Sequence, residues 1–178
     1  MDLVQQEQNK MLPIAKFEIG FIDDPFLRPS LNIYVCGCWH KCKNCQNKEL
    51  QDPDSELCQK YTLSQICQKI DTIKDSFVKS VVYLGGDFGF YPMWLFEISK
   101  FAHECNLANV FYTGFKLEDI NPKYLAYIDV VIDGEYIEEL KQDSFPASSN
   151  QRVWVKKEGK FVAVDPKTLP INQHNQQS

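Results

Sequence analysis

The sequence predicts an α/β protein, a partial (open) β/α barrel with a mostly parallel sheet and a C-terminal hairpin. Short apolar runs alternate with helix-period stretches from residue 80 to residue 133, which is the pattern of βαβ units. The chain has 178 residues, too few for a full eight-stranded barrel of about 250 residues. Its hydrophobic content of 44% and charged content of 24% are ordinary for a globular domain.

The first half of the chain predicts two strands joined by a loop. Residues 14–21 are β-rich, and residues 22–30 contain two aspartates and two prolines, which favour a loop. Residues 30–36 form an apolar run that predicts the second strand. Residues 53–60 are polar and are interpreted as a connector.

Two amphipathic helices flank a buried strand. Residues 62–77 carry apolar side chains at helical spacing, with Thr62 as the N-cap. Residues 80–84 are continuously apolar, as expected for a buried parallel strand. Residues 92–105 predict the second helix, with Pro92 in its first turn.

The second half of the chain continues the alternation. The remaining predicted elements are a strand at 109–113, a short helical stretch at 117–127, a strand at 127–133, a helical turn at 136–141 and a hairpin of 151–155 with 161–164. We expect one domain over residues 13–165, a flexible arm over residues 1–12 and a polar tail over residues 166–178.

Composition excludes several classes of function. The net charge of −5 gives no basic surface for nucleic acid. The polar N-terminus lacks the apolar core of a signal peptide, and no apolar run approaches the roughly 18 residues of a membrane helix. An odd count of seven cysteines without a signal favours reduced thiols over a secreted disulfide framework. We therefore expect a cytoplasmic protein with no membrane and no nucleic-acid partner.

Four of the cysteines fall within ten positions, from Cys36 at the end of the second predicted strand into the loop that follows it. Cys38, Cys42 and Cys45 have a Cys-x-x-x-Cys-x-x-Cys spacing that supplies three thiolates on one short loop. Cysteine thiolates are the usual ligands of iron–sulfur clusters. A fourth cysteine with matching spacing is missing downstream, so a cluster here would leave one iron open to another ligand.

A structural zinc site is the alternative interpretation of this loop. It would use the same three cysteines with Cys36 or His40 as the fourth ligand. No second Cys-x-x-Cys pair exists, which counts against it. Cys36, Cys67 and Cys105 are interpreted as small hydrophobic residues in or near the core, and Cys58 has no clear role.

Gly85, Gly86 and Asp87 follow the buried strand at 80–84. Consecutive glycines at the carboxyl end of a strand let a ligand approach the backbone, and this is the edge where α/β folds bind ligands. Asp87 could accept a hydrogen bond from an amino group. We expect these residues to face the same opening as the cysteine loop.

The three-cysteine loop followed by a Gly-Gly-acid strand end resembles the radical S-adenosylmethionine superfamily. The resemblance implies that Cys38, Cys42 and Cys45 hold a [4Fe–4S] cluster whose open iron chelates S-adenosylmethionine. It also implies that Gly85, Gly86 and Asp87 contact the methionyl end of that cofactor.

Within the superfamily, the chain is most similar to the activating proteins of anaerobic ribonucleoside-triphosphate reductase. Residues 37–47 look like the family's Gly-Cys-x-His-x-Cys-x-Gly-Cys-x-Asn. Residues 112–115 resemble its Tyr-Thr-Gly strand end, and residues 129–141 its Asp-Gly segment with the acidic turn. Residues 148–152 look like its Ser-Ser-Asn-Gln-Arg.

The resemblance implies a defined reaction and defined partners. An electron from the cluster cleaves S-adenosylmethionine to methionine and a 5′-deoxyadenosyl radical, which abstracts hydrogen from a glycine of the large subunit of the reductase. Reduced flavodoxin or a similar protein is the implied electron donor. Asn44 and Gln46, beside the third cysteine, would line the adenosyl side.

Two other functions stay open at this point. One is a small radical enzyme that modifies a different peptide or a small molecule, against which the stretch at 148–152 counts. The other is a non-catalytic iron–sulfur or zinc-binding module, which would bind metal without cleaving S-adenosylmethionine.

Overall fold

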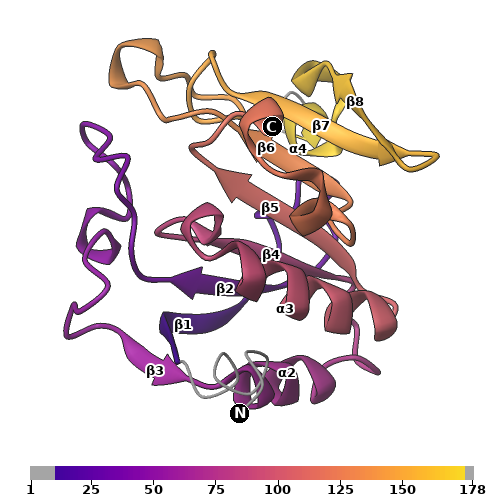
Figure 1. The fold of residues 1–178 in the computed structure, drawn as a ribbon. Coiled ribbons are helices and arrows are strands. Elements are labelled where there is room, and N and C mark those ends of the chain that lie inside the picture. The colour runs from indigo at the N-terminus through magenta and orange to yellow at the C-terminus, as the bar shows by residue number, and fades with distance from the viewer. Residues whose placement is uncertain (1–10, 175–178) are drawn as a thin grey trace.

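The computed structural model describes residues 11–174, which form one eight-stranded sheet with helices packed against it (Figure 1). The strand order is β3-β1-β2-β4-β5-β6-β7-β8. The strands are β1 (Leu12–Gly20), β2 (Ser30–Val35), β3 (Gln59–Tyr61), β4 (Ser80–Gly85), β5 (Ala108–Thr113), β6 (Val130–Asp133), β7 (Arg152–Lys157) and β8 (Lys160–Val164). The α-helices are α2 (Leu63–Asp71), α3 (Pro92–Glu104) and α4 (Pro170–His174). Short 3-10 helices are η1 (Lys48–Leu50), η2 (Phe88–Phe90), η3 (Leu117–Asp119), η4 (Pro122–Leu125), η5 (Glu138–Leu140) and η6 (Pro166–Thr168).

The prediction of a mostly parallel sheet is wrong. Three pairings are parallel, β2 with β4, β4 with β5 and β5 with β6. The other four pairings among the described strands, at the two flanks of the sheet, are antiparallel. The physical reason is the connections: β1 and β2 are joined by a loop without a crossover helix, and β7 and β8 by a tight turn, and neither connection can return the chain parallel.

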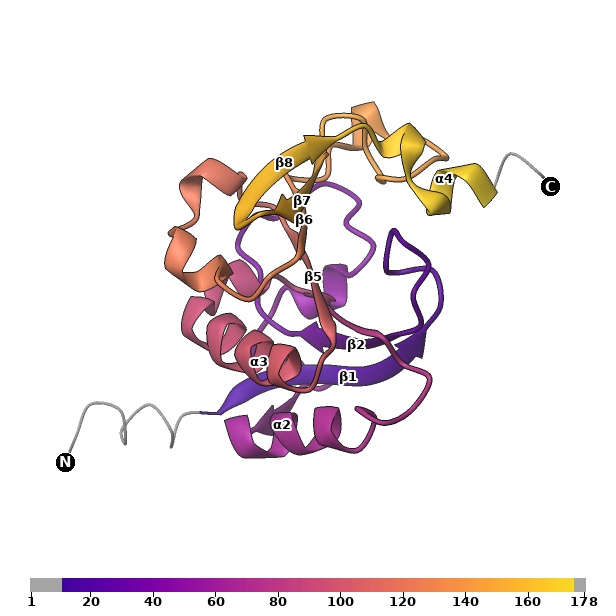
Figure 2. The same cartoon turned by 90° about the vertical axis from the view of Figure 1, so that its right-hand side faces the viewer.

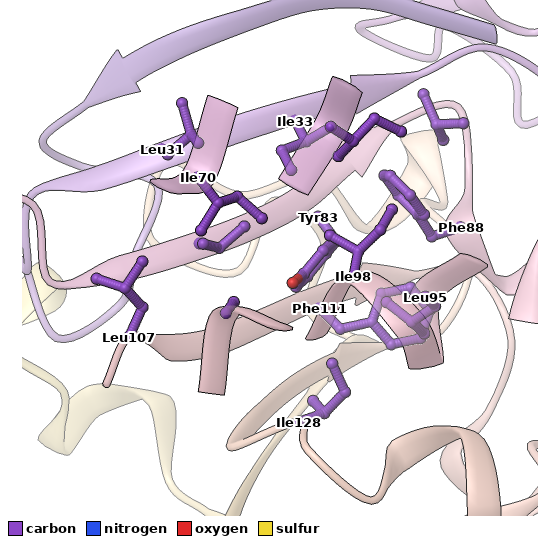
Figure 3. Close-up of a cluster of buried hydrophobic side chains, with 14 of the residues drawn as sticks. Leu31, Ile33, Ile70, Tyr83, Phe88, Leu95, Ile98, Leu107, Phe111 and Ile128 are labelled. Carbon is purple, nitrogen blue, oxygen red and sulfur yellow. The ribbon is translucent and has the colours of Figure 1, made fainter. Parts of the chain in front are cut away.

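The central parallel strands are buried on both faces. In β4 the side chains alternate, so that Val81 and Tyr83 join the core under α2 and α3, while Val82 joins the core on the opposite face. Figure 3 shows the first core, to which α2 contributes Ile70 and α3 contributes Leu95 and Ile98.

The second core lies on the other face of the sheet and is smaller. Val110, Ile132 and Val153 form it together with Leu169 from the C-terminal segment. Figure 2 shows the sheet curving from β1 toward β8, with α4 and α3 on different sides. This curvature brings the loops after the parallel strands toward one edge, where the site is built.

Helix α2 begins as predicted and ends early. The Thr62 hydroxyl and the Gln65 side chain form a reciprocal capping box. The helix stops at Asp71, whereas the helical spacing predicted continuation to Phe77. The hydroxyls of Thr72 and Ser76 each donate to the backbone carbonyl three residues earlier, which competes with helix hydrogen bonding.

The predicted arm and the predicted tail lie at the two ends of the chain, partly outside the described residues. Residues 1–10 of the predicted arm lie outside the described residues, and Leu12 already begins β1 as a buried side chain. The predicted polar tail contains structure, because Leu169 is buried and the Asn172 amide donates to the carbonyl of Phe145. Among residues 11–174, no helix is long and apolar enough to cross a bilayer.

Candidate functional site

The cysteine loop leaves the carboxyl end of β2 and is fixed by backbone hydrogen bonds. The N–H of Gly37 donates to Leu50 O and the N–H of Cys38 donates to Gln51 O, at 2.8 and 3.0 Å. These two bonds hold the start of the cysteine loop against residues 50–51, where the loop ends. The thiols of Cys38, Cys42 and Cys45 are free, and their residues are half-buried.

The other two cysteines of the first half of the chain are bonded to each other. Cys36 and Cys58 form a disulfide with a Cα–Cα distance of 6.3 Å. Cys36 is buried, as predicted, but the disulfide corrects the expectation that the thiols are reduced, and it assigns a role to Cys58. The missing signal was β3, which pairs with β1 and carries the polar connector back beside Cys36. Cys67 and Cys105 are free and half-buried, as expected.

Glycines at the end of β4 let the cysteine loop pack directly on this strand. Gly85 has a φ of +105°, and a Cβ on it would lie 2.6 Å from the backbone oxygen of Val35. A Cβ on Gly86 would lie 2.5 Å from the carbonyl oxygen of Gly37. The glycine pair is therefore required by contact between two backbones, in addition to any contact with a ligand. The side chain of Asn47 closes the loop by donating to Gly85 O at 3.2 Å.

Asp87 is a buried carboxylate that accepts several hydrogen bonds from the surrounding loops. Its Oδ2 accepts from the Thr113 hydroxyl at 2.9 Å and from the Gly114 N–H at 2.8 Å. Its Oδ1 accepts from the Gly89 N–H at 2.7 Å. The residue is 2% exposed. The prediction that Asp87 accepts from a ligand amino group stays a prediction, and its oxygens already have several protein donors.

His40 lies inside the cysteine loop and contacts two carboxylates. Its Nε2 is 3.0 Å from Oδ2 of Asp87, and its Nδ1 is 3.3 Å from Oε1 of Glu135. The hydrogen bond to Asp87 raises the pKa of His40, which burial opposes. The imidazole packs against the rings of Phe90 and Phe115. With both ring nitrogens occupied, His40 offers no free lone pair for a metal, and Cys36 is in a disulfide, so the zinc interpretation loses both of its fourth ligands.

Glu135 reaches the site from a loop that the stretch at 148–152 holds in place. The amide of Asn150 donates to Glu135 O at 2.8 Å, and that of Gln151 donates to Gly134 O at 3.1 Å. The same loop supplies an exposed ion pair between Glu139 and Lys43 of the cysteine loop, at 2.9 Å. These contacts give residues 148–152 a structural task that their sequence did not show.

Asn44 and Gln46 lie on the exposed side of the cysteine loop. Asn44 adopts a left-handed conformation with φ of 54°, which asparagine tolerates better than most residues. Its side chain also contributes, after Tyr136, to lowering the pKa of Glu138. A contact of Asn44 and Gln46 with a ligand stays a prediction.

The three free thiols of the loop match the donor set of a cluster. Burial raises the pKa of Cys38 to about 11, and the nearby charges of Asp87, Cys42 and Cys45 act in the same direction. Metal binding at the Cys38 thiol therefore releases a proton. Within the described chain no three His, Cys, Asp or Glu side chains converge on one ion. Three separated thiolates on one loop are the donor set of a cluster, where each cysteine binds a different iron.

Comparisons with known proteins agree with this donor set. Residues 27–154 match the family described as "4Fe-4S single cluster domain", and this range contains every site residue named above. The class of protein defined by the loop and the match is thus a carrier of one [4Fe–4S] cluster.

Two relatives identify the family within this class of [4Fe–4S] proteins. The chain is 30% identical over 150 residues to the anaerobic ribonucleoside-triphosphate reductase-activating protein of Enterobacteria phage T4, which covers 80% of this chain and 93% of the relative. It is 29% identical over 149 residues to the protein of the same name from Escherichia coli K12, covering 77% and 94%. The chain belongs to the family of anaerobic ribonucleoside-triphosphate reductase-activating proteins.

A solved structure shares the fold. The crystal structure of QueE from Escherichia coli superposes with a TM-score of 0.52 at 14% sequence identity, covering 64% of this chain and 57% of the other. This likeness supports the mixed α/β architecture alone.

Proposed function

We propose that the chain binds one [4Fe–4S] cluster and S-adenosylmethionine and generates a glycyl radical on anaerobic ribonucleoside-triphosphate reductase. The observation that carries the proposal is the set of three free thiols on one loop, Cys38, Cys42 and Cys45, in a member of the activating-protein family. When bound, the cluster and S-adenosylmethionine supply an electron and a 5′-deoxyadenosyl radical that takes hydrogen from a glycine of the partner.

The residues of this chain supply position in that reaction. Cys38, Cys42 and Cys45 would hold the cluster. The backbone of Gly85 and Gly86, which lies against the start of the cysteine loop, would orient the methionyl end together with Asp87. The contact between the end of β4 and the loop supports this assignment, because it brings both ligand sets to one edge of the sheet.

Asn44 and Gln46 would line the adenosyl side, which their exposure beside Cys45 supports. Residues 13–165 would act as one catalytic domain built on an open barrel, which the curvature of the sheet and the likeness to QueE support. The proposed setting is the cytoplasm, with reduced flavodoxin or a similar protein as the electron donor.

The test is anaerobic reconstitution with iron and sulfide, followed by reduction and incubation with S-adenosylmethionine. We expect 5′-deoxyadenosine, and on addition of the reductase a glycyl doublet in the electron resonance spectrum. Absence of 5′-deoxyadenosine from a fully loaded protein under strongly reducing conditions would overturn the enzymatic assignment. Product without the doublet would point to a different substrate.

A further inference from the structure

The imidazole of His40 connects the cysteine loop to two other loops of the site. Asp87 Oδ2 approaches one ring nitrogen at 3.0 Å, and Glu135 Oε1 approaches the other at 3.3 Å. The three residues come from the loops after β2, β4 and β6, which are three separate strands of the sheet. One side chain therefore bridges three separate strand ends.

The environment of the ring restricts its position. A Cβ on Gly114 would lie 2.6 Å from Cδ2 of His40, so this glycine, at the end of β5, gives the ring its space. The rings of Phe90 and Phe115 have centroids 5.0 and 4.7 Å from the imidazole. The His40 side chain is only 11% exposed although it belongs to a loop.

The carboxylate that receives His40 is itself fixed. The hydroxyl of Thr113 and the N–H groups of Gly89 and Gly114 hold Asp87 in one orientation. A carboxylate so held determines the position of the imidazole and not the reverse. Glu135 is more exposed, at 53%, and acts as the weaker of the two contacts.

His40 stands midway between the first two cysteines of the loop. Because its ring is held by Asp87 and Glu135, the segment from Cys38 to Cys42 is anchored at its midpoint. Positioning of first ligands by hydrogen-bonded neighbours is a general feature of metal sites.

We propose that His40 is a positioning residue: clamped between Asp87 and Glu135, it holds the cysteine loop in the cluster-binding arrangement before iron arrives. On this proposal the carboxylate of Asp87 also holds His40. The proposal deepens the proposed function and rests on it for the identity of the cluster. The clamp itself is a property of the protein without metal and is measured there.

The first experiment measures amide hydrogen exchange of residues 38–45 in the metal-free, full-length protein. His40→Gln keeps polarity but cannot reach both carboxylates, and we expect exchange in this loop to rise about fivefold, the equivalent of one lost hydrogen bond. Glu139→Gln is the matched control, because Glu139 contacts the same loop only through the exposed ion pair with Lys43, and exchange should stay unchanged. Unchanged exchange in His40→Gln would overturn the proposal.

The second experiment separates positioning from general stabilisation. In reconstituted protein, iron release from His40→Gln to a ferrous chelator should be about tenfold faster than from the wild type. The line shape of the reduced cluster in the electron resonance spectrum should change. The urea midpoint for unfolding of the protein should stay close to that of the wild type. Equal release rates, or an altered rate with an identical spectrum, would contradict a positioning role.

A second variant guards against misfolding of His40→Gln. Glu135 is half exposed, so Glu135→Gln is expected to fold, and it should raise loop exchange by less than His40→Gln does. No rise in Glu135→Gln would overturn the two-sided clamp. If the wild type shows the clamp but forms no 5′-deoxyadenosine, the proposed function fails and the positioning role stands.

Discussion

Two buried aspartates, Asp87 after β4 and Asp133 at the end of β6, lie at the ends of two strands of the same sheet and have different partners. Asp87 follows β4 and is 2% exposed, and Asp133 ends β6 and is fully buried. Asp133 is paired with the guanidinium of its cross-strand neighbour Arg152, whose Nε lies 3.0 Å from Oδ1. Asp87 has no arginine or lysine among its described partners and is held by hydroxyl, amide and imidazole groups.

The difference in partners shows that Asp133 has a structural role, whereas Asp87 belongs to the site. A guanidinium that bridges two strands locks Asp133 in place, and the Asp133 carboxylate also accepts from the Leu117 N–H at 2.7 Å. Its effect on the site is indirect, through the loop that carries Glu135. Asp87 contacts the cysteine loop itself through His40. Similar burial at similar strand ends therefore gives a structural ion pair in one case and a polar centre of the site in the other.

Removing the Arg152 guanidinium, the charge partner of Asp133, should have the largest effect on stability. Arg152→Ala leaves the Asp133 carboxylate buried without its charge partner, which should lower the free energy of unfolding by about 3 kcal/mol, the lower end for buried pairs because Arg152 is partly exposed. Urea denaturation of the metal-free protein measures this. Lys74→Ala, which breaks an exposed pair with Asp71, is the control and should leave the midpoint unchanged. An equal loss in both variants would mean that Asp133 is not a buried structural pair.

Amide substitution of the two aspartates should separate their roles. Asp87→Asn presents an amide to donors and should cost about 2 kcal/mol, together with a reduced iron content after reconstitution. Asp133→Asn should destabilise the protein while the folded fraction keeps its iron. Iron per chain and the urea midpoint, measured on both variants, check this. The comparison fails if Asp133→Asn loses iron to the same extent as Asp87→Asn.

Removal of one donor from Asp87 should have a smaller effect. Thr113→Val keeps the shape of a buried side chain and deletes one of the hydrogen bonds, so we expect a loss of about 1 kcal/mol. The remaining donors keep the carboxylate in place, and the iron content should change less than in Asp87→Asn. A loss as large as that of Asp87→Asn would show that Thr113, and not the set of donors, fixes this carboxylate.

The smallest effect is expected on the outer side of Arg152. Glu118 lies 2.7 Å from the Arg152 guanidinium but is exposed, so Glu118→Gln should leave the urea midpoint unchanged within error. The same denaturation series measures it. A clear decrease in the urea midpoint of Glu118→Gln would show that Glu118, and not Asp133, is the structural partner of Arg152.

The sequence predicted the parts of the site that depend on short spacing. The three cysteines, the glycine pair and the strands that carry them lie where the local pattern placed them, because strand ends and loops follow from apolar runs and glycines. The antiparallel flanks were missed, since pairing direction depends on contacts between distant segments. The Cys36–Cys58 disulfide was missed for the same reason, because it needs β3 beside β1.

The partners of His40 could not be derived from the sequence. Glu135 is 95 positions away from it, and only the order of the parallel strands brings the two loops together. A signal was present, in that His40 stands between two expected ligands and Glu135 follows a glycine at the end of another strand of the same sheet, β6. That signal predicts a contact only when the ends of the two strands are known to lie at the same edge of the sheet.

The central claim, that Cys38, Cys42 and Cys45 alone hold the cluster, is tested most directly by iron and sulfide content after anaerobic reconstitution. We expect a full cluster in the wild type and in Cys105→Ala, whose residue lies at the C-terminal end of α3, and none in Cys42→Ala. Equal loss of iron from Cys42→Ala and Cys105→Ala, or a full cluster in Cys42→Ala, would contradict it.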